Sequence, residues 1–205
     1  MALFFNKKQK QRLTMTILHI SDTHNCHKEL GTLPEADVIV HSGDFTRDGT
    51  EEEAYDFINW LCDLPYKHKV FIAGNHDLCL RGAEGIEGLS DDVHYLCNSG
   101  VEIDGLKFWG IPYMGQVIIP EDTDVLVTHV PPYGMCDLAD YGKGLEHRGD
   151  KMLMKQVMQV QPRYHLFGHE HDAYGVMKHG DVVFSNASVM DSKYRIVNKP
   201  RLFRI

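Results

Sequence analysis

The sequence lacks several features that would place it in other protein classes. No apolar run approaches the roughly 18 residues that a helix needs to cross a bilayer, so no membrane span is predicted. Acidic residues outnumber basic ones, 29 against 21, and no basic stripe favours nucleic acid as a partner. The 5 cysteines form no C-x-x-C pair, and no signal peptide is recognisable. Unpaired cysteines in such a chain favour a reducing, cytoplasmic setting.

The sequence also lacks internal repeats, low-complexity tracts and interdomain linkers. Its 205 residues suit one domain with a substantial core, predicted over residues 15–205. Residues 1–14 are predicted to be a flexible extension. Because this stretch combines Leu3, Phe4 and Phe5 with several Lys and Arg residues, a membrane-surface or partner-binding segment is the alternative. Nothing in the sequence indicates the oligomeric state.

What the sequence does contain is a series of short apolar runs rich in β-branched residues. They cover residues 16–20, 37–40, 69–73, 124–128 and 164–167, and polar residues follow each of them. Continuous apolar runs of this length are typical of strands that are buried on both faces. Together with helical segments between them, they predict a layered α/β fold. Ligands of such sheets bind at the carboxyl ends of the strands, so the polar residues there are expected to converge.

Two helices are predicted between the strands. The first begins with a capping box, in which Thr50 is the N-cap and Glu53 reaches back to it. Its inward face is predicted from the spacing of apolar residues up to Pro65: Tyr55, Ile58, Leu61 and Cys62. The second begins after Asp150 and ends before Pro162, and its inward residues are predicted to be Leu153, Val157 and Val160.

Two hairpins are predicted, over residues 101–109 and 176–184. Asp104-Gly105 supplies the first turn and His179-Gly180 the second, so His179 is interpreted as a turn residue. The chain has 13 histidines in all, and most of the others lie elsewhere in or beside the apolar runs. Among these, His41 and His165 flank motifs and are candidates for contacts behind a site.

Metal-ligand residue types follow every one of the five apolar runs. Each short pattern is common by chance, but the ordered set at successive strand ends predicts a catalytic metal centre. Mixed imidazole and carboxylate donors suit Mn, Fe, Zn, Co or Ni better than Ca or Mg. The predicted ligands are Asp22, His24, Asp44, Asn75, His129, His169 and His171.

The residue types also suggest a mechanism. Two divalent cations about 3.5–4 Å apart can lower the pKa of a bridging water, and the resulting hydroxide is a strong nucleophile. His76 follows a predicted ligand but lies outside the set, which makes it the candidate acid for the leaving oxygen. Asp77 is predicted either to hydrogen-bond His76 and fix its tautomer or to form a structural salt bridge.

These blocks resemble the signature of the calcineurin-like metallophosphoesterase superfamily, D-x-H, G-D, G-N-H-[DE], H and G-H-x-H, over about residues 16–190. The resemblance implies a double β-sandwich flanked by helices. It also implies that Asp44 bridges two metals, with the other ligands divided into two groups: Asp22, His24 and His171, and Asn75, His129 and His169. The stretches 64–69, 73–77, 129–134 and 161–169 are most similar to small metallophosphoesterase-domain-containing proteins, which include cyclic-nucleotide phosphodiesterases. Val130 departs from that pattern, where glycine is usual.

The expected function is hydrolysis of small phosphodiesters such as cyclic nucleotides. A phosphomonoesterase, including a protein phosphatase, is the alternative because the same ligands serve both reactions. A non-catalytic scaffold would be expected to have lost ligands, and none is missing. The segment 131–150 is predicted to form one wall of the pocket, with Arg148 or His147 contacting phosphate and Tyr133 stacking on a base; a solvated loop is the alternative.

Overall fold

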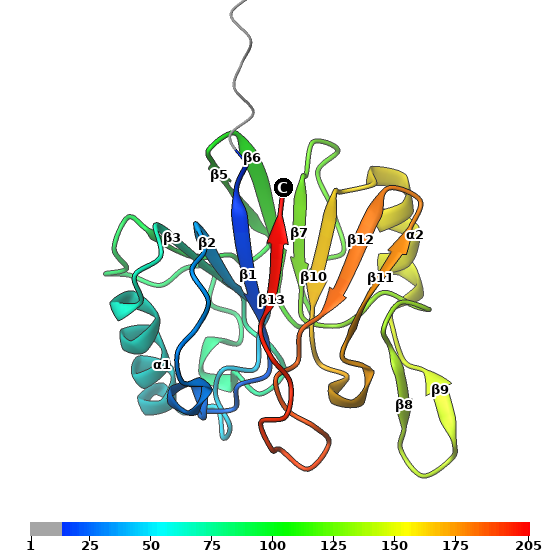
Figure 1. The fold of residues 1–205 in the computed structure, drawn as a ribbon, viewed down its shortest axis with the longest axis horizontal. Helices are drawn as coiled ribbons and strands as arrows, with labels where there is room; N and C mark the ends of the chain where they lie inside the picture. The colour runs from blue at the N-terminus through cyan, green and yellow to red at the C-terminus, as the bar shows by residue number, and fades with distance from the viewer. Residues whose placement is uncertain (1–13) are drawn as a thin grey trace, which may run out of the picture.

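Two β-sheets pack face to face in the computed structural model, which describes residues 14–205 (Figure 1). The five-stranded sheet has the order β13-β1-β2-β3-β4. Its strands are β1 (Thr16–Ile20), β2 (Val38–His41), β3 (His68–Phe71), β4 (Val93–Tyr95) and β13 (Arg201–Arg204). All its pairings are parallel except that of β13 with β1.

The six-stranded sheet has the order β11-β12-β10-β7-β6-β5. Its strands are β5 (Ser99–Ile103), β6 (Leu106–Ile111), β7 (Val125–Thr128), β10 (Tyr164–Phe167), β11 (Gly175–His179) and β12 (Val182–Asn186). Its centre, from β6 through β7 and β10 to β12, is parallel, and an antiparallel strand lies at each edge. A separate hairpin joins β8 (Leu138–Asp140) to β9 (Leu145–His147).

Side-chain alternation along the strands explains why both faces of each sheet are buried. Ile17, Val38 and Val40 point into the core between the sheets, together with Val125 and Val127 of the other sheet. Their neighbours on the opposite face pack against helices. One such cluster joins the five-stranded sheet to α1 (Glu51–Asp63), and another joins the six-stranded sheet to α2 (Lys151–Val160). The predicted layered α/β fold is therefore confirmed, in the double-sandwich form that the resemblance implied.

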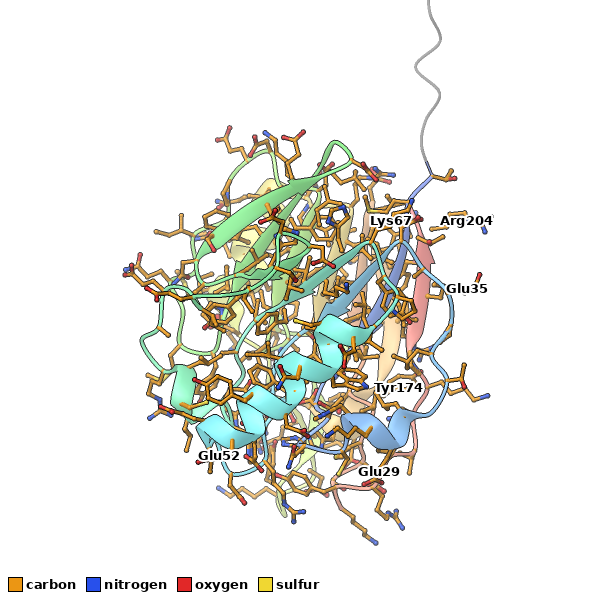
Figure 2. The ribbon with its side chains drawn as sticks, turned by 90° about the vertical axis from the view of Figure 1, so that its left-hand side faces the viewer. Glu29, Glu35, Glu52, Lys67, Tyr174 and Arg204 are labelled. Atoms are coloured by element: carbon orange, nitrogen blue, oxygen red, sulfur yellow. The ribbon has the colours of Figure 1, made fainter. Side chains whose placement is uncertain are left out.

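Helix α1 differs in two details from the prediction. Tyr55 is 64% exposed, because the buried stripe runs through Ala54, Phe57 and Leu61 at helical spacing. Figure 2 shows this helix lying across the outer face of the five-stranded sheet, with Glu52 in its first turn. Thr50 is the N-cap, as expected, and accepts a hydrogen bond from the Glu53 amide. The Glu53 carboxylate does not return to Thr50 but accepts bonds from the three preceding amides, those of residues 47–49.

Both predicted hairpins form, but one of their two turns uses other residues than expected. Asp104 and Gly105 both have positive φ and form the predicted turn between β5 and β6. His179 instead pairs with Val182 as the last residue of β11, so Gly180 and Asp181 form that turn. Residues 1–13, nearly all of the predicted extension, lie outside the described residues. Within residues 14–205, no helix is long and apolar enough to cross a membrane.

Candidate metal centre

The predicted ligands come from the loops that directly follow β1, β2, β3, β7 and β10. Parallel register places these loops at one edge of each sheet, and the face-to-face packing brings the two edges together. The result is a cluster in which Asp22, Asp44 and His129 are buried, whereas Asn75, His169 and His171 are partly open. A set of residues spread over about 150 positions of the chain therefore meets in one place.

Backbone geometry at the cluster is unusual. Residues with side chains rarely adopt a left-handed conformation, and such conformations concentrate at functional sites. They occur here at Asp22 (φ 57°), His24 (φ 40°), Asp44 (φ 58°) and His169 (φ 70°). Close packing fixes the same loops. A side chain on Gly168 would overlap Asp22 Oδ2, and one on Gly43 would come within 2.6 Å of His129 Nδ1.

One half of the cluster contains Asp22, His24 and His171. His171 Nε2 lies 3.5 Å from Asp22 Oδ1 and 3.2 Å from His24 Nε2. His171 Nδ1 is 3.0 Å from the Asp191 carbonyl oxygen and must donate to it, which leaves Nε2 free to face the cluster. His24 Nε2 in turn lies 3.8 Å from Asp44 Oδ2.

The other half contains Asn75, His129 and His169 around the same Asp44 carboxylate. His129 Nε2 lies 3.3 Å from Asp44 Oδ2, and the Asn75 amide oxygen is 2.9 Å from His129 Nε2 and 2.8 Å from His169 Nδ1. His129 Nδ1 is 2.9 Å from the carbonyl of Ser42, to which it donates, so again the free nitrogen faces the cluster. Asp44 thus lies beside a histidine of each half.

The donor atoms fit metal ions. Ligands at about 2.0–2.3 Å from one ion lie about 3.0–3.7 Å from each other. The nitrogen and oxygen separations of 3.2, 3.3, 3.5 and 3.8 Å lie in or near this range. His24, Asp44 and His76 form a third possible group. The described residues could therefore hold metal ions on both sides of Asp44.

Electrostatics of the chain agree with a cation site. Burial alone would raise the pKa of Asp22, but its hydrogen bond to His171 and the nearby His129 keep that pKa well below its usual range. Burial opposes a charge on His129, yet the Asp44 carboxylate beside it raises the pKa of His129 to about 9. The charge on His129 in turn lowers the pKa of Asp44, so Asp22 and Asp44 both remain ionised. Buried carboxylates require positive charge nearby, and a metal ion that displaces the His129 proton would supply it.

His76 and Asp77, predicted to act as a pair, do not contact each other through their side chains. Asp77 is buried and accepts bonds from the amides of Asp44, Thr46 and Gly74. Burial and the Asp44 charge raise the pKa of Asp77 to about 7, and these amides oppose that rise. His76 Nδ1 instead donates to the Arg47 carbonyl at 2.8 Å. Neither alternative predicted for Asp77, a hydrogen bond to His76 or a salt bridge, is found among the described residues, because its carboxylate binds backbone amides instead.

A cavity of 320 Å³ opens beside the cluster. Its lining includes Asp44, Asn75, His76, His169 and His171, and also Asp140, Tyr141, Glu170, Asp172 and Tyr194. The Tyr194 ring centre lies 4.9 Å from that of His24 and 5.3 Å from that of His171. Tyr141 donates to the buried Glu170 at 3.0 Å. Sequence reasoning missed Tyr194, which follows β12 in a loop without a recognisable motif.

The segment 131–150 does reach this cavity, but through Ala139, Asp140 and Tyr141 rather than through the predicted contacts. Tyr133, His147 and Arg148 are absent from its lining, and the first two border a neighbouring hollow. His147 Nδ1 lies 2.6 Å from the buried Asp137. The Arg148 guanidinium lies 5.0 Å from the centre of the Tyr141 ring. Arg148 therefore contacts a residue of the wall instead of the space where phosphate would bind.

Three buried histidines lie behind the ligand loops. His41 Nε2 bonds the Thr23 hydroxyl at 3.0 Å, and His165 Nε2 bonds that of Thr128 at 2.8 Å. His19 bridges the two sheets through Ser42 and Ser185. Burial lowers the pKa of each of these histidines to about 3, so they are neutral. They form a polar layer that supports the loops, as expected for His41 and His165.

Two packed sheets with a His/Asp/Asn cluster at their joined edge define a class of metal-dependent hydrolases. The model of the calcineurin-like phosphoesterase family matches residues 15–173, and the chain belongs to this family. Membership supports a hydrolase that cleaves phosphate esters with the help of metal ions. The matched region contains every predicted ligand, whereas Tyr194 lies beyond it.

Relatives of known name agree with this assignment. UPF0046 protein C25E10.12 of Caenorhabditis elegans is 36% identical, in an alignment that covers 91% of this chain and 79% of that protein. Metallophosphoesterase domain-containing protein 1 of Homo sapiens is 34% identical, in an alignment that covers 88% of this chain and 68% of that protein.

Solved structures share the fold. TT1561 of Thermus thermophilus has a TM-score of 0.60 at 14% identity, covering 85% of this chain and 89% of that one. A structure described as a novel archaeal phosphodiesterase has a TM-score of 0.52 at 18% identity, covering 93% of this chain and all of that one (100%). At these identities the likeness concerns the arrangement of strands and helices.

Proposed function

We propose that this chain is a phosphodiesterase that hydrolyses small phosphodiesters, such as cyclic nucleotides, at a centre for two transition-metal ions. The observation that carries the proposal is the pair of ligand groups on either side of Asp44. Asp22, His24 and His171 would hold one ion, and Asn75, His129 and His169 the other. Mn, Fe, Zn, Co and Ni suit these mixed donors.

Bound metal ions would supply Lewis-acid polarisation of the phosphoryl group and acidify a water molecule. The protein itself holds the ligand atoms in position. Carbonyl oxygens of Ser42 and Asp191 hold the rings of His129 and His171 so that their Nε2 atoms face the cluster. The buried polar layer behind the loops restrains them further. These contacts prepare the ligand atoms before any ion binds.

His76 is proposed to protonate the leaving oxygen. It lines the cavity, and its Nδ1 is committed to the Arg47 carbonyl. Its Nε2 is therefore the atom that can carry a proton toward substrate. Tyr194 packs beside His76 as well as beside two ligands, with ring centres 6.3 Å apart, and closes that side of the cavity.

A diester fits the charge of the cavity better than a monoester does. Asp140 and Asp172 line it and are both exposed. A phosphate monoester carries nearly two negative charges at neutral pH, because its second pKa is about 6, whereas a diester carries one. Carboxylates at the rim therefore repel a doubly charged monoester about twice as strongly as a singly charged diester. The five unpaired cysteines support the reducing, cytoplasmic setting that belongs to the same proposal.

The test compares two chromogenic esters on the full chain loaded with Mn²⁺. We expect kcat/KM for bis(p-nitrophenyl) phosphate to exceed that for p-nitrophenyl phosphate by about tenfold, the ratio that about 1.4 kcal/mol of charge repulsion gives. Cyclic 2′,3′- and 3′,5′-nucleotides are then tested as natural-type diesters. Equal or greater activity on the monoester would overturn the proposal in favour of a phosphomonoesterase, and a protein that binds no metal would end the enzyme interpretation.

A further inference from the structure

A second cavity, of 270 Å³, lies on the other side of Asn75. It forms where the loop after β3 meets the connection between β4 and β5 and the loop after β6. Leu78, Tyr95, Tyr113 and Met114 supply most of its apolar lining. Asn75 lines this cavity as well as the first one, so the two spaces meet at a residue proposed to bind metal.

The mouth of this cavity exposes three large apolar side chains that the other residues of the described part, 14–205, leave open. Leu78 is 49% exposed, Tyr113 38% and Met114 82%. Exposed apolar side chains are common singly, but three around one cavity indicate a binding surface. The backbone there is also unusual, since Met114 (φ 61°) and Asn98 (φ 47°) both adopt left-handed conformations. Strain of this kind persists where the surrounding structure requires it and often accompanies a site.

Size and shape suit a flat ring. A cavity of about 150 Å³ is known to admit benzene, so 270 Å³ accepts an aryl group or a nucleobase. The Tyr113 ring lies 6.1 Å from the ring of His169 and 6.2 Å from that of His129, measured between centres. It therefore stands between the proposed ligands and the cavity, where a planar group joined to phosphate could stack on it.

The two cavities differ in chemistry. The first contains His76 and the carboxylates of Asp140 and Asp172, whereas the second is lined mainly by apolar and aromatic groups. A phosphodiester has two ester bonds, and only the leaving oxygen needs a proton. In an open diester the bonds join two separate organic arms, and in a cyclic nucleotide one sugar carries both, so that the sugar and its base stay attached to phosphate as the retained arm. We infer that the second cavity binds the retained arm of the diester and selects a planar, aromatic one, while the leaving arm lies on the His76 side. This inference rests on the proposed function.

The experiment uses two diesters that differ only in the retained arm. Bis(p-nitrophenyl) phosphate retains an aryl group after cleavage, and methyl p-nitrophenyl phosphate retains a methyl group. We expect Tyr113→Ala to lower kcat/KM for the first by about tenfold and for the second by less than about twofold, because aromatic stacking is lost only with the aryl arm. Tyr113→Phe should behave as wild type. Tyr55→Ala, which removes an exposed tyrosine on α1, is the matched control.

A binding measurement separates this inference from the proposed function. Phenyl phosphate resembles the product that keeps the aryl arm, and methyl phosphate is its counterpart. Calorimetric titration of the Mn²⁺-loaded chain should show phenyl phosphate binding about tenfold more tightly, with the preference absent in Tyr113→Ala. If this preference is found but no diester is cleaved, the proposed function fails and the cavity assignment stands. If Tyr113→Ala changes both members of each pair equally, or neither, the cavity assignment is wrong.

Discussion

Two regions of the molecule border the main cavity, and they are built in opposite ways. The strand-end loops are buried and tightly packed, so that even one methyl group on Gly168 would overlap Ser21 and Asp22. The segment 131–150 carries the β8–β9 hairpin, which extends away from both sheets (Figure 1). Its tip is open to solvent, with Tyr141 65% and Leu145 70% exposed. Its base is held by buried Asp137, which accepts bonds from two glycine amides and His147, and Tyr141 adds one bond to Glu170.

This difference separates two tasks. Metal ligands must be held within a few tenths of an ångström, which packing at the edge of a sheet provides. A wall that contacts substrate can vary without unfolding the protein, and a peripheral hairpin allows that. Substitutions in the strand-end loops should therefore strongly reduce activity or stability. Substitutions in segment 131–150 should have mild effects that are confined to substrate binding.

The largest effect is expected for Asp44→Asn, which removes the charge shared by both ligand groups. Loss of several kcal/mol of metal-ion stabilisation predicts a decrease in kcat of about a thousandfold or more. Mass spectrometry of the bound metal should show reduced occupancy in the same variant. Activity within about tenfold of wild type would mean that Asp44 does not connect the two halves.

The second-largest effect is expected for a substitution that changes only the packing of a strand-end loop. Gly168→Ala should lower the free energy of unfolding by about 1–3 kcal/mol and reduce activity, because the new methyl group displaces Asp22 or Ser21. Gly85→Ala is the matched control, since its added carbon meets nothing within 4 Å. Urea unfolding of both variants checks the prediction, which an unchanged Gly168→Ala midpoint would contradict.

A milder effect is expected in segment 131–150. Arg148→Ala removes the guanidinium from the Tyr141 ring, a contact worth about 0.5–1 kcal/mol, so KM should rise about two- to fivefold with kcat nearly unchanged. Steady-state kinetics on bis(p-nitrophenyl) phosphate measure both constants, and exposed Arg163→Ala is the control. A loss of about a hundredfold or more would restore the direct phosphate contact first expected of Arg148.

The smallest effect lies at the opposite edge of the sheet, far from both regions along β1 and β2. Hydrogen bonds from the Thr16 amide and hydroxyl, with Lys67 nearby, lower the pKa of Asp37 to about 2. A lowered folded-state pKa stabilises the protein above pH 3.8 and less as the pH falls toward 2. Partial exposure reduces this contribution to about 1 kcal/mol.

Asp37→Asn should therefore be less stable than wild type by about that amount near pH 5, and the difference should shrink toward about pH 2.5. Urea unfolding at both pH values, with activity near neutral pH as the control, tests this. A difference that stays constant with pH would show that the carboxylate charge is not responsible.

The clustering of the proposed metal ligands could be predicted from the sequence, because each of them lies just after a buried strand. Apolar runs fix the strands, parallel register fixes their shared edge, and short motifs supply the donors. Helix α1 shows where this reasoning weakens. Tyr55 and Phe57 are both apolar at plausible positions, and only packing against the sheet decides that Phe57 is buried. The ends of helices and strands, and the choice of residues on their buried faces, depend on such contacts.

The walls of the cavities could not be predicted in the same way. Tyr194, Asn98 and Met114 come from irregular loops, and no periodicity relates them to the site. Arg148 and His147 looked suitable because they follow a ligand along the chain, but the β8–β9 pairing turns them away from the cavity. Their neighbour Tyr141 lies at the end of β8 and reaches it.

The Glu53 carboxylate has a consequence beyond the start of α1. It accepts the amides of residues 47–49, and the carbonyl of Arg47, in the same loop, accepts the Nδ1 proton of His76. The loop of residues 47–49 therefore both anchors the start of α1 and orients the ring of His76. Substitution of Glu53 is therefore expected to change the turnover rate as well as the stability, although its side chain does not line the cavity beside the cluster.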